Sequence, residues 1–104
     1  METKKIFNLA DSIAVAEESI VSREFVKNAN GGMTLFSFDK GQRLSEHTAP
    51  FDAVIQVVEG QALITIDGEP FKVNAGEMII MPANHPHSVT AEQPFKMLLT
   101  MIKG

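Results

Sequence analysis

Three histidines, His47, His85 and His87, carry most of the reactive chemistry that this chain offers. The sequence contains no cysteine, which excludes thiolate metal ligands, cysteine nucleophiles, disulfides and iron–sulfur clusters. Neutral imidazoles bind Zn, Fe, Ni, Mn or Cu, and an imidazole with a pKa near neutrality also works as a general base. The candidate chemistry is therefore a histidine site, with or without a divalent metal.

Short apolar segments rich in β-branched and aromatic residues must position these histidines. Turn residues separate them: Asn30-Gly31-Gly32 predicts a hairpin, and Gly60 and Asp67-Gly68 predict that the three strands between residues 53 and 73 form a meander. Strands at such close spacing are typical of a β-sandwich or barrel, so the predicted fold class is all-β. The expected strands cover residues 20–27, 33–38, 53–59, 62–67, 71–73, 78–81, 87–91 and 95–102.

The length favours a single domain, since 104 residues suffice for one hydrophobic core but not for two. We expect residues 1–30 to form an N-terminal segment with the first strand, and residues 31–104 to form the barrel. Only residues 8–18 have helix-forming character, with Asp11 or Ser12 as the cap. This N-terminal segment is expected to be irregular or to form one or two helical turns.

Charge and hydropathy exclude two classes of partner. The net charge is −4, and Lys4-Lys5 are the only adjacent basic residues, which argues against nucleic acid because phosphate binding relies on clustered lysine and arginine. No apolar run approaches the roughly 18 to 20 residues that span a bilayer, and polar residues interrupt the N-terminus. We therefore expect a cytoplasmic protein without a nucleic-acid or membrane partner.

The segment that begins at Gly41 reads GQRLSEHTAPFDAVIQVVEG and resembles the first motif of the cupin superfamily. Gly41, His47 and Gly60 fall on fixed positions of that motif. Ala49 stands where the family has a second histidine, and Ala53 stands where it has glutamate or glutamine. Two of the three metal ligands of this motif are thus replaced by alanine.

The segment that begins at Gly76 reads GEMIIMPANHPHSVTA and resembles the second cupin motif. Gly76, Pro82 and His87 fall on fixed positions, whereas Asn84 replaces a glycine and Ala91 replaces an asparagine. The single metal ligand of this motif is His87, which is present. The resemblance covers about residues 31–102.

The resemblance implies a small single-domain cupin with an RmlC-like jelly-roll barrel, in which His47 and His87 project into one pocket. The two histidines could hold a divalent metal there: Zn, Fe, Ni, Mn or Cu. The alternative is a pocket without metal, because two histidines are fewer ligands than tight metal sites supply. Small cupins are often homodimers, and exposed sheet edges or an exchanged N-terminal segment would suit such a dimer. We therefore expect a small-molecule ligand and a homodimer.

Strand alternation adds candidates around the two motif histidines. Arg43 shares the parity of His47, which would aim its guanidinium into the cavity to hold a carboxylate. The alternative for Arg43 is a surface ion pair. His85 lies two residues before His87 and either turns toward the pocket mouth as a third metal ligand or stays exposed in its loop. The expected pocket residues are Arg43, Ala49, Phe51, Ala53 and Ile55.

Three functions compete on this reading, and the sequence assigns no catalytic residue. The first is a ligand-binding cupin, in which an apolar barrel holds a small organic molecule whose polar end meets His47 and His87. The second is a metal-dependent enzyme of the dioxygenase or isomerase type with a reduced histidine ligand set. The third is metal-free catalysis with one of these histidines as the general base. A shared fold does not choose among them.

Overall fold

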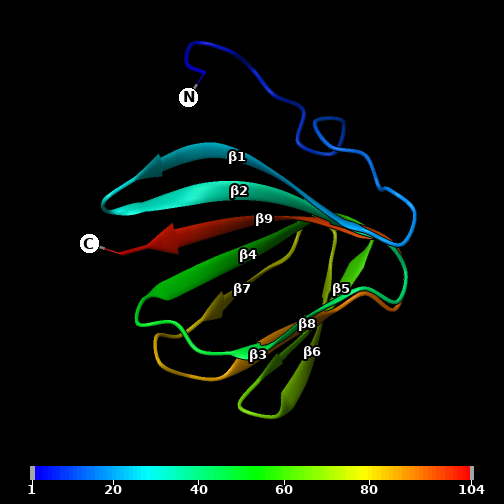
Figure 1. Cartoon of the computed structure of the whole chain (residues 1–104), viewed down its shortest axis with the longest axis vertical. Coiled ribbons are helices and arrows are strands. Elements are labelled where there is room, and N and C mark those ends of the chain that lie inside the picture. The colour runs from blue at the N-terminus through cyan, green and yellow to red at the C-terminus, as the bar shows by residue number, and fades with distance from the viewer. Residues whose placement is uncertain (1, 104) are drawn as a thin grey trace.

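The computed structural model describes residues 2–103, which form strands, turns and loops and no helix. Within residues 2–103 there is no helix of the length and apolar character that crossing a bilayer requires. Antiparallel strands build two sheets, one with the order β1-β2-β9-β4-β7 and the other with the order β3-β8-β5-β6 (Figure 1). The nine strands are β1 Ile20–Asn28, β2 Gly31–Phe38, β3 Arg43–His47, β4 Asp52–Glu59, β5 Gln61–Ile66, β6 Glu69–Asn74, β7 Met78–Met81, β8 His87–Thr90 and β9 Phe95–Ile102.

The core lies between the two sheets, which face each other as the layers of a jelly roll (Figure 1). Alternation along each strand produces this core, because every second side chain points to the same face of a sheet. In β4 the buried positions are Ala53, Ile55 and Val57, and β5 buries Ala62, Ile64 and Ile66 in the same rhythm. The all-β fold class predicted from the sequence is therefore confirmed.

The predicted meander from residue 53 to residue 73 is wrong at its first turn. β4 pairs with β7 and β9, whereas β5 pairs with β6 and β8, so the chain changes sheets at Gly60. Gly60 has a φ of 77°, and a Cβ there would lie 2.7 Å from the carbonyl oxygen of Pro94 and 3.0 Å from the Cβ of Phe95. The corner thus requires glycine for its conformation and for its close contact with the start of β9.

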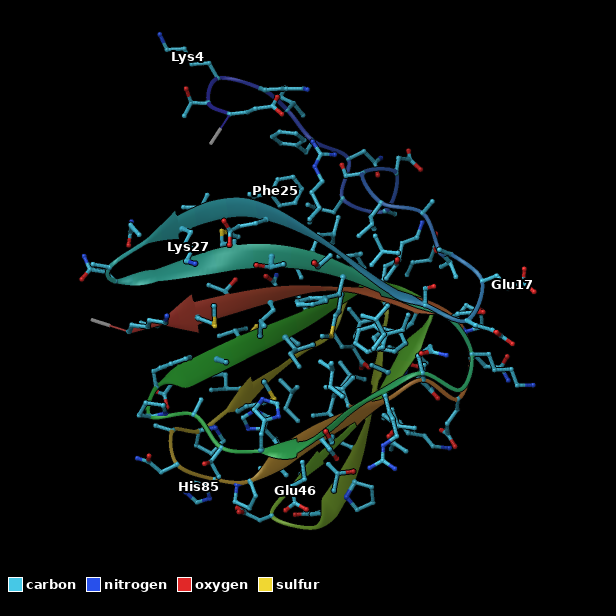
Figure 2. The ribbon with its side chains drawn as sticks, in the orientation of Figure 1. Lys4, Glu17, Phe25, Lys27, Glu46 and His85 are labelled. Carbon is cyan, nitrogen blue, oxygen red and sulfur yellow. The ribbon has the colours of Figure 1, made fainter. Side chains whose placement is uncertain are left out.

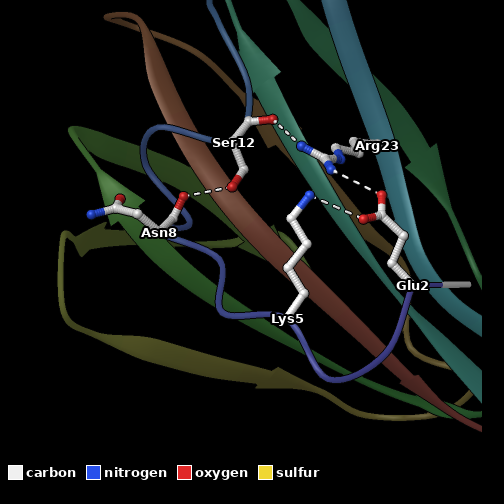
Figure 3. A network of polar contacts seen from close by, with 5 residues as sticks. All are labelled: Glu2, Lys5, Asn8, Ser12 and Arg23. Carbon is white, nitrogen blue, oxygen red and sulfur yellow. Dashed lines mark hydrogen bonds and ion pairs between the residues drawn. The ribbon is translucent and has the colours of Figure 1, made fainter.

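Residues 8–18 take the irregular form, one of the two forms expected for them, with turns and bends and no helix. The backbone N–H of Asp11 donates to the side-chain oxygen of Asn8 at 3.2 Å. The Ser12 hydroxyl donates to the Asn8 carbonyl at 2.6 Å (Figure 3). The first of these bonds has the form of a helix N-cap, but turns and bends follow it and no helix forms. Arg23 of β1 then donates to the Ser12 carbonyl at 3.1 Å, which ties this turn to the sheet.

The N-terminal segment covers the outer face of the five-stranded sheet, away from the core. Lys96 of β9 donates to the Ala10 carbonyl at 2.6 Å, and the hydroxyl of Ser37 in β2 donates to the Ala14 carbonyl at 2.8 Å. Ser37 is fully buried, so this bond satisfies a polar group that water does not reach. The segment is therefore fastened to two adjacent strands.

The corner at Gly60 and the turn at Gly41 allow two causes of instability to be separated. Both glycines have positive φ, but a Cβ at Gly41 would meet nothing within 4 Å. Gly41→Ala is expected to lower the free energy of unfolding by roughly 1–2 kcal/mol through backbone strain alone. Gly60→Ala should lose a further ~1–3 kcal/mol, since its methyl group also collides with fixed backbone. Urea unfolding of both variants measures the difference, and equal losses would contradict this role of the corner.

Candidate functional site

One cavity opens between the two sheets, and its walls are apolar except for two imidazoles. The cavity has a volume of about 70 Å³, and on the same measure one water needs roughly 10–15 Å³. A small organic molecule therefore fits, with part of it reaching the open mouth. The lining residues are Leu44, His47, Ala49, Phe51, Ala53, Ile55, Met81, His87, Val89, Met97, Leu99 and Met101.

The wall on the five-stranded sheet owes its depth to Ala53 in β4. Ala53 pairs with Met81 of β7 on one side and with Met101 of β9 on the other. The short alanine side chain leaves room between two long, flexible thioethers, which adapt to an irregular guest. The expected pocket residues Ala49, Phe51, Ala53 and Ile55 all line the cavity, together with the methionines, whose part in it the sequence did not determine.

The opposite wall comes from β3 and β8, whose pairing is irregular. Leu44 pairs with Val89 and His47 pairs with His87, so two residues of β3 stand against one of β8 between these pairs. The extra residue in β3 changes which side its side chains face, so Leu44 and His47 both line the cavity although they are three positions apart. Arg43 instead is exposed and lies outside the cavity, which corrects the expectation that it points inward.

His47 and His87 meet edge to face at the cavity wall. Their Nε2 atoms are 3.1 Å apart, and the two rings lie at 73° to each other. The His47 Nδ1 is 2.9 Å from the Ser45 carbonyl oxygen, and the His87 Nδ1 is 3.2 Å from the His85 carbonyl oxygen. A carbonyl only accepts hydrogen bonds, so both Nδ1 atoms carry a proton and donate it. In two neutral rings, both Nε2 atoms would then present lone pairs to each other.

The two rings differ in their exposure. His87 is 5% exposed, whereas His47 is largely open to solvent. Burial, followed by the charge of His47, lowers the pKa of His87 from its ordinary value of 6.5, and the bond to the His85 carbonyl opposes this shift. His87 therefore stays neutral to a lower pH than an ordinary histidine.

His85 is turned away from the cavity. Its Nδ1 lies 2.6 Å from a carboxylate oxygen of Asp67, and both side chains are 51% exposed. Figure 2 shows His85 on the loop before β8, pointing outward from the layers. The structure therefore brings His47 and His87 together and leaves His85 paired with Asp67 instead of serving as a third ligand.

The cavity walls do not fit the metal centre that the family resemblance implies. No group of three or more histidine, cysteine or acidic side chains is placed to hold a metal within residues 2–103, whereas tight sites supply three or four protein ligands. Ala49 and Ala53 occupy the wall where further ligands would be needed. No carboxylate lines the cavity, so a dication there would have no opposite charge from the protein, which is costly in apolar surroundings.

The lowered pKa of His87 predicts a specific acid sensitivity. Unfolded His87 takes up a proton near pH 6.5, and folded His87 takes it up at lower pH, so the contribution to stability is complete above pH 6.5 and is lost as the pH falls toward the folded pKa. His87→Gln should lose less stability than the original protein between pH 6.5 and pH 4.5. Urea unfolding across this range measures it, and parallel curves for the two proteins would contradict the prediction.

Comparisons with known proteins agree with this architecture. A conserved protein of unknown function from Streptococcus pyogenes, SPY1581, is 38% identical with a TM-score of 0.93, over 100% of this chain and 91% of that one. A cupin 2 conserved barrel domain protein from Leptotrichia buccalis is 46% identical with a TM-score of 0.91, over 93% of this chain and 47% of that one.

A curated relative matches only part of the chain. The protein named polyketide synthase CurC from Streptomyces cyaneus is 34% identical over 59 residues, which are 56% of this chain and 38% of that protein. The family model described as the cupin domain matches residues 34–102, which include both motif histidines and eight of the nine strands in whole or in part. This match, together with the two-sheet jelly roll and the shared pocket of His47 and His87, shows that the chain belongs to the cupin family.

Proposed function

We propose that the protein binds a small, mainly apolar organic molecule in the cavity between its sheets. The observation that carries this proposal is the apolar cavity whose only polar side chains are the imidazoles of His47 and His87. Binding sites for small molecules combine apolar walls with a few polar groups that fix orientation. The two imidazoles would meet the polar end of the ligand.

The methionines support a binding role for a molecule of adaptable shape. Met81, Met97 and Met101 line the cavity, and methionine fills irregular space at little conformational strain. A metal-dependent dioxygenase or isomerase, the alternative considered from the sequence, would need ligands that Ala49 and Ala53 do not supply. Binding without metal is therefore the function that the lining residues favour.

Methionine methyl groups offer a direct test of binding in the cavity. In protein labelled with ¹³C at the methionine methyls, we expect benzyl alcohol, benzamide or benzoate to shift the signals of Met81, Met97 and Met101. Met33 and Met78 lie outside the cavity, and Met78 is 55% exposed, so their signals should stay in place. EDTA should leave the shifts unchanged.

A cavity-filling variant provides the matched control. Ala53→Leu adds bulk at the centre of the wall, in the space that the ligand would occupy. The apparent affinity read from the methyl shifts should therefore fall about tenfold. Ala75→Leu adds the same bulk at an exposed turn and should bind as the original protein does. No shift with any of the three probes, or equal binding by both variants, would refute the proposed function.

A further inference from the structure

A row of side chains crosses the five-stranded sheet on the face opposite the cavity. Val54 stands between Ala53 and Ile55, which line the cavity, so its side chain points to the outer face. Each member of the row pairs with the next across neighbouring strands, and we call the row the outer ladder: Val26 of β1, Met33 of β2, Thr100 of β9, Val54 of β4 and Ile80 of β7. The outer ladder carries no charged side chain.

The N-terminal segment covers only the other part of this face. We call residues 2–16 the strap, which Figure 1 shows as a loop outside the five-stranded sheet. Leu35 and Leu98 point outward beside the strands that the strap is bonded to, and they are 0% and 4% exposed. In contrast, Ile80 and its neighbour Met78 are 54% and 55% exposed. The outer face thus has a raised half under the strap and an open, apolar half along β4 and β7.

The strap also presents an apolar side chain that its own chain does not cover. Ile6 is 98% exposed, whereas the next residue, Phe7, packs on Phe25 with ring centres 4.8 Å apart. One exposed isoleucine is ordinary on a protein surface, but a contiguous apolar row marks an interaction site. Ile6 and the outer ladder are therefore two apolar features that a second copy could cover at once.

The size of the outer ladder decides how two copies could meet. Five strands about 4.8 Å apart and about 10 Å along each strand give roughly 200 Å², well below the roughly 800 Å² per partner that stable dimers bury. A contact of ladder on ladder alone is therefore too small. A strap that lies on the partner's ladder adds its own residues to the interface, and two-fold symmetry repeats this contact.

Charges beside the two apolar features are complementary. Lys4 lies two residues before Ile6, and Figure 2 shows it at the tip of the strap, pointing away from the layers. Asp52 is exposed and pairs with Ile102 at the border of the outer ladder. Neither Lys4 nor Asp52 forms an ion pair within residues 2–103. A strap from a second copy would bring a cation toward this carboxylate, which favours the correct orientation of the two copies.

We propose that the outer face forms a two-fold symmetric homodimer, in which the strap of each copy lies on the outer ladder of the other, with Ile6 against Ile80. The raised half of each face then fills the open half of its partner. This interface lies behind the cavity wall, so the inference does not depend on the proposed ligand.

Analytical ultracentrifugation of the full chain across micromolar concentrations tests the interface. The original protein should sediment as a dimer, and Ile6→Ser and Ile80→Ser should each raise the dissociation constant of the dimer by about tenfold or more. Ile6 is almost fully exposed in one copy, so a loss in Ile6→Ser reports a contact between copies and not a fault of folding. Phe71→Ser is the matched control, because Phe71 is a 36% exposed apolar residue on β6 of the other sheet, and it should stay dimeric.

Three outcomes would overturn the proposal. The first is a monomer of the original protein throughout the concentration range. The second is a dimer that Ile6→Ser leaves unchanged, which would place the strap outside the interface. The third is a loss in Phe71→Ser as large as in Ile80→Ser, which would place the interface on the other sheet.

The double variant tests the contact between the two isoleucines. If Ile6 packs on Ile80 of the partner, either single change already removes the contact, so the double variant should lose less than the product of the two single losses. Losses that multiply fully would contradict this contact.

Discussion

The pairing of His47 with His87 across β3 and β8 is the constraint on which the site depends. The extra residue in β3 turns His47 toward the cavity after Leu44 has already faced it. The carbonyls of Ser45 and His85 then fix both rings by accepting their Nδ1 protons. One acceptor lies in β3 and the other in the loop directly before β8, so the orientation of the imidazoles follows from the pairing of these two strands and from that loop.

The space beside this pair follows from two positions in the opposite sheet. Gly60 lets the chain leave β4 for the second sheet, so the two sheets enclose a core instead of continuing as one surface. Ala53 then replaces a ligand position of the family by a methyl group between Met81 and Met101. The substitution that removes a metal ligand is also the one that leaves room for a guest.

Much of the fold was predictable from local patterns, because alternation and turn residues act over a few positions. The hairpin at Asn30 to Gly32 and the strands Met78–Met81 and Phe95–Ile102 formed as expected. The meander failed at Gly60, since a glycine turn looks the same in sequence whether the next strand pairs with its neighbour or joins another sheet. Residues 8–18 were expected to be either irregular or helical, and their turns are the irregular form, held to the sheet by hydrogen bonds from Arg23, Ser37 and Lys96.

The part of the site that the family motifs contain was predictable from the sequence. The part that depends on strand pairing was not. His47 and His87 share the cavity as the motifs implied, but Arg43 faces out because alternation was counted through an extra residue that the sequence does not mark. The positions of Met81 and Met101 beside Ala53 likewise depend on which strands pair with β4. These strands, β7 and β9, come from distant parts of the chain.

The orientation of the histidine pair, on which the site depends, is measured most directly by ¹⁵N NMR of the imidazole nitrogens. We expect both rings of the pair to carry a proton at Nδ1, donated to the carbonyls of Ser45 and His85, and His85 serves as the reference ring in the same spectrum. Either ring of the pair found without a proton at Nδ1 would contradict this orientation.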